Sequence, residues 1–116
     1  MPKTIMPTGP AVVLDAQSAD EAEGIFFIKG TNYYLSVALL GDGVTSSGVI
    51  TIEEAYYEEG GTPPTAWSLL GTVNASDVSQ GVQKISRFVG SHWVVRVRIT
   101  TEVGGGGTVT AVVWAN

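Results

Sequence analysis

Cysteine is absent from this sequence of 116 residues. Without thiols the chain forms no disulfide bond, holds no thiolate zinc site and supplies no cysteine nucleophile. Small secreted domains often use disulfides, so this absence favours synthesis in a cytoplasm. The first seven residues also lack the apolar run of a secretory signal, so we expect no signal peptide.

Histidine occurs once, as His92, which limits acid–base chemistry. A serine triad needs a nucleophile beside its histidine, and Ser91 would point to the opposite face of a strand. We therefore expect His92 to be a surface or interface residue beside a tight turn. We predict no catalytic residues, and we predict that the protein is not an enzyme.

Charged residues are scarce, at 15% of the chain, and 6 basic residues face 11 acidic ones. Affinity for nucleic acids and for anionic membranes comes largely from lysine and arginine, so we expect neither as a partner. The longest apolar stretches, such as residues 33–40, are far shorter than the roughly 20 residues of a membrane-spanning helix.

The sequence is rich in β-branched residues, with 16 Val, 12 Thr and 7 Ile against 6 Leu. These residues favour strands. Short apolar runs separated by turn signals predict a single-domain, all-β antiparallel sandwich, jelly-roll-like, at residues 11–116. The eight expected strands are residues 11–15, 24–29, 33–40, 48–57, 67–73, 82–89, 92–101 and 108–114.

Three segments lie outside this regular pattern. Residues 1–10 contain three prolines, which deny backbone donors, so they predict an extended arm: either a frayed terminus or an arm that reaches a neighbouring subunit. Residues 15–23 favour one short helical turn capped by Ser18, or an exposed acidic loop. Residues 104–107 are four glycines followed by a strand, which predicts a hairpin tip and not a phosphate-binding loop.

The strand at 92–101 has the clearest alternation. Period two separates its side chains into an inward and an outward set. The outward set includes Arg96 and Arg98, which form either a polar outer face or salt bridges across an interface. The residues expected to face the core are Trp93, Val95, Val97 and Ile99.

Two pairs of glutamates, at residues 53–54 and 58–59, flank Tyr56 and Tyr57. Paired carboxylates can bind calcium or hydrolyse glycosides, but no loop of spaced ligands is present and glycosidases usually need a large cleft. The pattern favours a solvated strand end or a polar interface rim, with no metal and no cofactor.

The aromatic residues exceed what one thin core can hold, because adjacent tyrosines on a strand point to opposite faces. Large exposed apolar patches mark association surfaces, and interfaces are enriched in Tyr, Trp and Arg. We therefore expect a homo-oligomer. The candidate subunit or capsid interface residues are Pro2, Ile5, Pro7, Tyr33, Tyr34, Tyr56, Tyr57, Arg96, Arg98 and Trp114.

Residues 47–116 resemble small all-β structural proteins of tailed bacteriophages. The resemblance rests on a glycine-led strand at 47–53, a Trp and short loop at 67–72, alternating Val and Arg at 93–101, and a Gly-Thr-Val-Thr strand at 107–113. The pattern is similar to that of jelly-roll capsid cement (decoration) proteins, and also to that of phage tail and fibre modules.

This resemblance implies binding and not turnover. A cement protein, as a homotrimer, would sit on the outer capsid surface of the virion, bridge major capsid protein subunits and stabilise the head. It would be made in the host bacterial cytoplasm. Two alternatives remain open: a tail, baseplate or fibre component, and a carbohydrate-binding module that uses Trp67 and Tyr56 or Tyr57 as a stacking platform.

Overall fold

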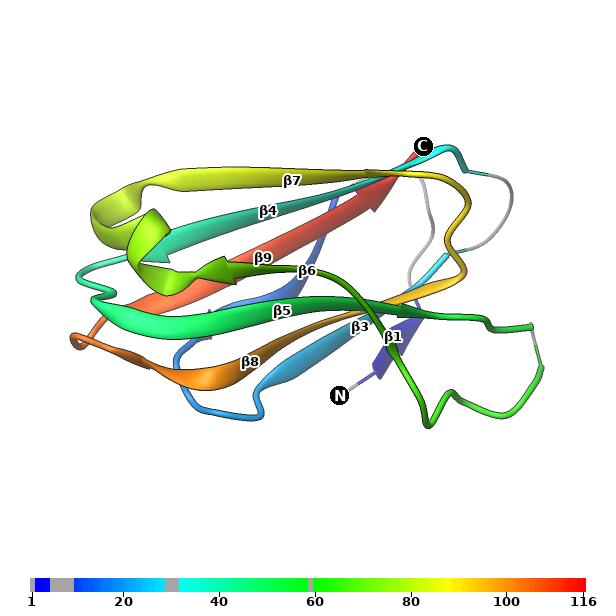
Figure 1. Cartoon of the computed structure of the whole chain (residues 1–116), viewed down its shortest axis with the longest axis horizontal. Helices are drawn as coiled ribbons and strands as arrows, with labels where there is room; N and C mark the ends of the chain where they lie inside the picture. The colour runs from blue at the N-terminus through cyan, green and yellow to red at the C-terminus, as the bar shows by residue number, and fades with distance from the viewer. Residues whose placement is uncertain (1, 5–9, 29–31, 59) are drawn as a thin grey trace.

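The computed structural model describes residues 2–4, 10–28, 32–58 and 60–116. Two sheets stack face to face as a β-sandwich, which confirms the predicted fold class (Figure 1). The first sheet has the order β1 (Pro2–Thr4), β3 (Glu23–Phe27), β8 (Val94–Gly104), β5 (Ser47–Ala55) and β6 (Ser68–Asn74). The second has the order β2 (Ala11–Gln17), β9 (Thr108–Ala115), β4 (Tyr34–Asp42) and β7 (Gln83–Val89).

Each of the eight predicted strands has a counterpart, and all pairs among them are antiparallel. The ninth strand, β1, pairs in parallel with β3 at the edge of the five-stranded sheet. The expectation that residues 1–10 form no packed element is therefore wrong for residues 2–4, whose backbone joins this chain's own sheet. Ile5 and Pro7 lie outside the described residues.

The core lies between the two sheets and follows the predicted alternation. Val95, Val97 and Ile99 of β8 point inward, as predicted, and are at most 1% exposed. The prediction that Trp93 faces the core is wrong, because this residue precedes β8 and is 46% exposed. Burial of each large apolar side chain contributes about 1.5–3 kcal/mol. The other large buried members include Leu14, Phe26, Leu35, Val37, Leu39, Ile50, Ile52, Val109 and Val113.

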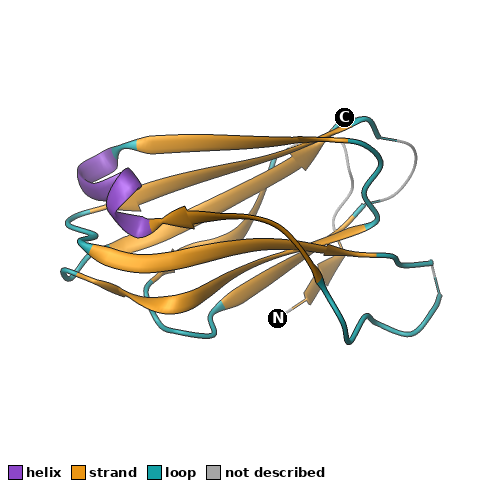
Figure 2. Cartoon of the chain, in the orientation of Figure 1, coloured by secondary structure: helices purple, strands orange, loops and turns teal. Residues whose placement is uncertain are grey.

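One 3₁₀ helix, η1 (Ala75–Gly81), closes one end of the sandwich where a plain break was expected (Figure 2). It buries Ala75 and Val78 against the core. The described part of the chain contains no helix long and apolar enough to cross a bilayer. Residues 15–23 form no helix; β2 extends through Gln17 and an exposed turn follows, which confirms the acidic-loop alternative.

Glycines at two places in the chain adopt backbone arrangements that other residues would hinder. A Cβ atom on Gly24 of β3 would lie 1.8 Å from the carbonyl oxygen of Val13 in β2, so the backbones of these two strands, which belong to different sheets, approach closely there. The prediction of a hairpin tip at residues 104–107 is wrong. These glycines connect β8 of one sheet to β9 of the other, so they do not join two paired strands. Gly105 and Gly106 there adopt φ of +102° and +91°, which glycine tolerates best.

Candidate functional site

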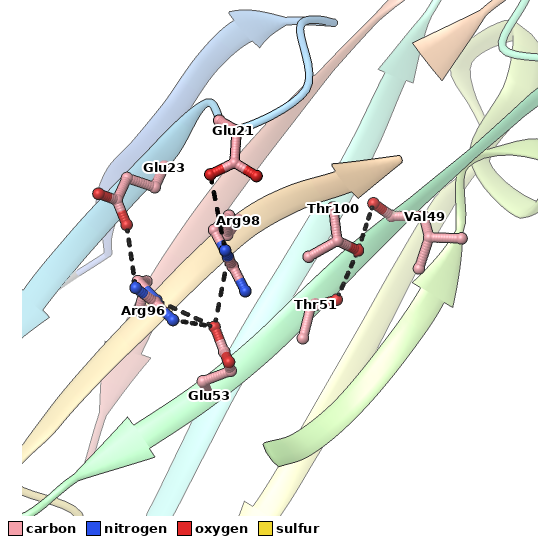
Figure 3. Close-up of polar contacts among 8 residues, drawn as sticks. All are labelled: Glu21, Glu23, Val49, Thr51, Glu53, Arg96, Arg98 and Thr100. Carbon is pink, nitrogen blue, oxygen red and sulfur yellow. Dashed lines mark hydrogen bonds and ion pairs between the residues drawn. The ribbon is translucent and has the colours of Figure 1, made fainter. Parts of the chain in front are cut away.

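The outward face of the five-stranded sheet carries an ion-pair network, which we call the charged face (Figure 3). The members are Glu21, Glu23, Thr51, Glu53, Arg96, Arg98 and Thr100. They come from β3, β5 and β8, which are adjacent in the sheet, and from the turn before β3. Period two brings them to one side, because their neighbours in sequence point into the core.

Glu53 is the centre of the charged face. Its Oε1 lies 2.8 Å from Nη2 and 2.9 Å from Nε of Arg96, and 3.6 Å from Nε of Arg98. Glu53 is 9% exposed, so this is a shielded interaction and not a surface pair. The two arginines therefore pair within the chain, on a polar outer face.

Two further carboxylates flank the arginines. Arg96 Nη1 lies 3.5 Å from Glu23, and Arg98 Nη1 lies 3.7 Å from Glu21. Three carboxylates against two guanidinium groups give the face a formal charge of −1. Beyond them, the hydroxyls of Thr51 and Thr100 hydrogen-bond at 2.8 Å.

Aromatic rings border one end of the charged face. The guanidinium of Arg96 lies 4.7 Å from the ring centroid of Trp67, a cation–π contact. Phe27 and Tyr57 meet edge to face at 4.9 Å. Tyr57 is consequently half-buried, and Trp67, one of the predicted stacking residues, stands beside polar side chains.

The outward face of the four-stranded sheet carries a row of apolar side chains between polar ones, which include Ser36, Gln83, Arg87 and Thr110. Val12, Val112, Ala38 and Ile85 are consecutive register partners across β2, β9, β4 and β7, and they form one continuous row. Val12 is 43% and Ile85 is 41% exposed. We call this row and its apolar neighbours on the same side the apolar face. Those neighbours are Tyr34, Leu40, Val89 and Trp114.

The end of the sandwich that holds the C-terminus gathers the single histidine and its partners. His92 is 4% exposed, which corrects the prediction of a surface residue. Its Nδ1 lies 2.7 Å from Oε1 of Glu54, and its backbone N–H donates to Oδ1 of Asn32 at 3.1 Å. The Ser91 hydroxyl donates to the Asn32 carbonyl at 3.0 Å, so it is engaged away from the imidazole.

An exposed aromatic pair lies beside this histidine. Tyr56 and Trp93 meet edge to face at 5.2 Å, and Tyr56 is 65% exposed. The negative charge of Glu58, followed by partial desolvation and a hydrogen bond to Glu58, raises the pKa of the Tyr56 hydroxyl. Tyr33, which is 69% exposed, lies at the same end because its N–H donates to the carbonyl of Asn116.

The structure thus distributes the predicted interface residues over several surfaces. Tyr34 and Trp114 lie on the apolar face, and Arg96 and Arg98 lie on the charged face. Tyr57 lies at the aromatic border of the charged face, and Tyr33 and Tyr56 lie at the sandwich end. Pro2 belongs to β1. Among the described residues no group of three or more His, Asp or Glu side chains could hold a metal ion.

Sequence reasoning missed the residues at the centre of both faces. Glu53 was expected at a solvated strand end or interface rim, yet it is buried between two arginines. The sequence did offer a signal, because opposite charges on neighbouring strands stabilise a sheet and two outward arginines on one strand favour an acidic residue opposite them. Val12, Ala38 and Ile85 gave no such signal, since only strand register brings them into one row.

The chain matches no protein-family model and no curated protein. Among solved structures it is similar to part of a β-glucosidase from Paenibacillus barengoltzii, with a TM-score of 0.51 and 11% identity over 97% of this chain. A family 6 carbohydrate-binding module gives a TM-score of 0.45 and 13% identity, covering 96% of this chain and 95% of the module. An arabinoxylan arabinofuranohydrolase from Bacillus subtilis gives a TM-score of 0.48 and 12% identity, and the match covers 98% of this chain and 28% of that enzyme.

This chain spans only 11% of the length of the β-glucosidase. At such identities the likeness concerns the fold, and function has to be argued from the surfaces of this chain.

Proposed function

We propose that the protein is a non-catalytic structural module that self-associates through its apolar face. The observation that carries the proposal is the unbroken row of Val12, Val112, Ala38 and Ile85 across all four strands. The row is exposed at its ends, at Val12 (43%) and Ile85 (41%), while Ala38 is 5% exposed. Exposed apolar side chains that gather on one sheet face mark an association site.

The specific role that we propose is that of a bacteriophage capsid cement protein. It rests on the sequence resemblance of residues 47–116 together with the apolar face. A trimer assembled through this face would bind the outside of the capsid and bridge neighbouring major capsid protein subunits. Because it would bind only the assembled shell, it would stabilise that shell by mass action, and many copies would add their effects.

The test is reconstitution on shells that lack the protein. Purified protein is added to these shells, and binding and the temperature of heat-induced rupture are measured. The proposal expects saturable binding and a higher rupture temperature. Absence of binding contradicts it, and fractionation of the native protein with tails instead of heads would favour the tail or fibre alternative.

Carbohydrate binding is a second candidate function, favoured by a different observation. Arg96 of the charged face lies against the Trp67 ring, and ligand sites typically combine aromatic rings with a few polar groups. Binding of this kind is compatible with association through the apolar face, because the two faces lie on opposite sides of the sandwich (Figure 1).

A further inference from the structure

Strand β7 forms one edge of the four-stranded sheet, with β4 as its only neighbour among the described strands (Figure 1). All seven of its residues pair with β4 without a register shift. The other described edges are interrupted, because β1 has three residues and contains Pro2, while β2 and β6 pair with register shifts. Short strands, prolines and bulges hinder the addition of a further strand. β7 alone among the described edges lacks these features, so it can accept another strand.

The hydrogen bonds to β4 show which backbone groups of β7 face the open edge. The N–H of Gly90 donates to the carbonyl of Tyr33 at 2.8 Å, and the carbonyl of Val82 accepts from the N–H of Gly41 at 3.4 Å. Both bonds continue the register of the ladder, so the even-numbered residues of β7 are the ones that bond to β4. No hydrogen bond among the described residues engages the N–H and C=O groups on the other side. These open groups belong to the odd-numbered residues Gln83, Ile85, Arg87 and Val89.

The sequence around Ile85 matches itself when it is read in the opposite direction. Residues 82–88 read Val-Gln-Lys-Ile-Ser-Arg-Phe, with apolar residues at both ends and in the middle. Two antiparallel copies centred on Ile85 therefore place Ile85 opposite Ile85 and Val82 opposite Phe88. Such apolar cross-strand pairs stabilise a sheet, and no two cations are opposed. The polar pairs are Gln83 with Arg87 and Lys84 with Ser86.

Exposure and backbone geometry favour the same register. Ile85 is 41% and Val82 is 53% exposed in the single chain, so each offers apolar surface that a partner can cover. Val82 has extended backbone, with φ of −70° and ψ of 145°, and continues the strand. With Ile85 at the centre, the open groups of Gln83, Ile85 and Arg87 meet their counterparts, and each pair exchanges two hydrogen bonds. A register centred on Ser86 would instead place Ile85 opposite Arg87, which mismatches apolar and charged side chains.

The two cations of β7 are compatible with this pairing. Lys84 lies 3.5 Å from Asp77 of η1, so a carboxylate of the same chain faces its charge. Arg87 would lie opposite Gln83 of the second copy, whose amide oxygen accepts hydrogen bonds. A register centred on Arg87 would oppose two cations and is disfavoured. The charges of this edge therefore select a register without closing the edge to a second copy.

We propose that two copies of the chain pair edge to edge through β7, antiparallel and centred on Ile85. A second copy is the partner that the self-matching sequence favours. The two four-stranded sheets then form one continuous sheet, and the row that ends at Ile85 continues into the same row of the second copy. This pairing goes beyond the proposed packing through the apolar face, because it uses backbone groups in the plane of the sheet and leaves that face open.

Amide hydrogen exchange, followed residue by residue by nuclear magnetic resonance, tests the pairing on the wild-type protein. At high concentration the amides of Gln83, Ile85 and Arg87 should exchange about tenfold more slowly than after dilution, because each gains a hydrogen bond. Val89 is the internal control, since its counterpart would be Gly81, whose φ of +82° is not that of a strand. The Val89 amide should exchange fast at both concentrations.

Gln83→Pro and Gln83→Ala form a matched pair of variants. Proline removes the N–H that points to the open edge and places its ring there, but it removes no hydrogen bond to β4. Alanine keeps the N–H. Gln83→Pro should lose the protection of Ile85 and Arg87, whereas Gln83→Ala should keep it. Circular dichroism checks that both variants fold, and the wild-type exchange pattern carries the test if Gln83→Pro does not.

Three results would overturn the proposal. Equal exchange rates for the three edge amides and Val89 at both concentrations would show an open edge. Protection that includes Val89 would show the register centred on Ser86, and protection that survives in Gln83→Pro would place its cause elsewhere.

Light scattering separates this outcome from that of the apolar face. If only the apolar-face packing holds, the protein is oligomeric while its edge amides exchange fast. If only the edge pairing holds, the edge amides are protected and the mass is that of two chains.

Discussion

Replacement of Glu53 by glutamine should be the most destabilising single change on the charged face. Glutamine keeps the shape of the side chain but removes the negative charge shared by Arg96 and Arg98. Glu53 contacts Arg96 at 2.8 and 2.9 Å, and the side chains are 11% and 17% exposed, so water screens the pair poorly. Breaking one partner of a buried pair costs about 3–5 kcal/mol.

The expected loss lies near the lower limit, about 3 kcal/mol, because Arg96 keeps Glu23 at 3.5 Å. Such a loss should lower the melting temperature of a domain of this size by roughly 10 °C. Urea unfolding gives the free energy, and circular dichroism gives the melting temperature.

The matched control is Glu21→Gln. Its side chain is 74% exposed and lies 3.7 Å from Arg98, so its removal should cost about 0.5 kcal/mol or less. A Glu53→Gln variant that loses less than about 1 kcal/mol, or no more than this control, would refute the reasoning. A double-mutant cycle with Arg96→Met isolates the pairwise part.

Further expectations concern packing and ionisation. Gly24→Ala should cost about 3 kcal/mol or more in urea unfolding, because its Cβ would meet the Val13 carbonyl oxygen at 1.8 Å and backbone cannot move aside cheaply. Gly71→Ala, where the nearest contact is an ordinary 3.5 Å, is the control, and an equal loss would contradict the packing argument. Glu58→Gln should lower the pKa of Tyr56 toward its ordinary value, because the negative charge that disfavours tyrosinate is gone. Ultraviolet titration, with Tyr56→Phe as the blank, would disprove this if the midpoint did not move.

The sequence predicted strands well where alternation is strong, as in β8, whose valines and arginines sort onto opposite faces. The sequence-based prediction failed for segments whose secondary structure depends on contacts with distant parts of the chain. The η1 helix holds only Ala75 and Val78 against the core, too few apolar residues for a helical period to be visible. Residues 2–4 become a strand because the edge of β3 accepts them, although Pro2 argued against pairing.

The two faces show the same limit. That Arg96 and Arg98 point outward follows from period two, but their shared partner Glu53 is 43 residues from Arg96 in sequence. Only the register between β5 and β8 brings them together. Likewise, Val12 and Ile85 lie at opposite edges of the four-stranded sheet, and no local pattern predicts that they end one apolar row.

The central claim is self-association through the apolar face, and Ile85→Glu tests it most directly. Ile85 is 41% exposed in the single chain, so a glutamate there should leave folding nearly unchanged but place a charge inside the interface. Light scattering coupled to size exclusion measures the mass at several concentrations. The account predicts a multiple of 12.1 kDa for the wild type and a single 12.1 kDa chain for the variant. A monomeric wild type, or a variant of the same oligomeric mass, would contradict it.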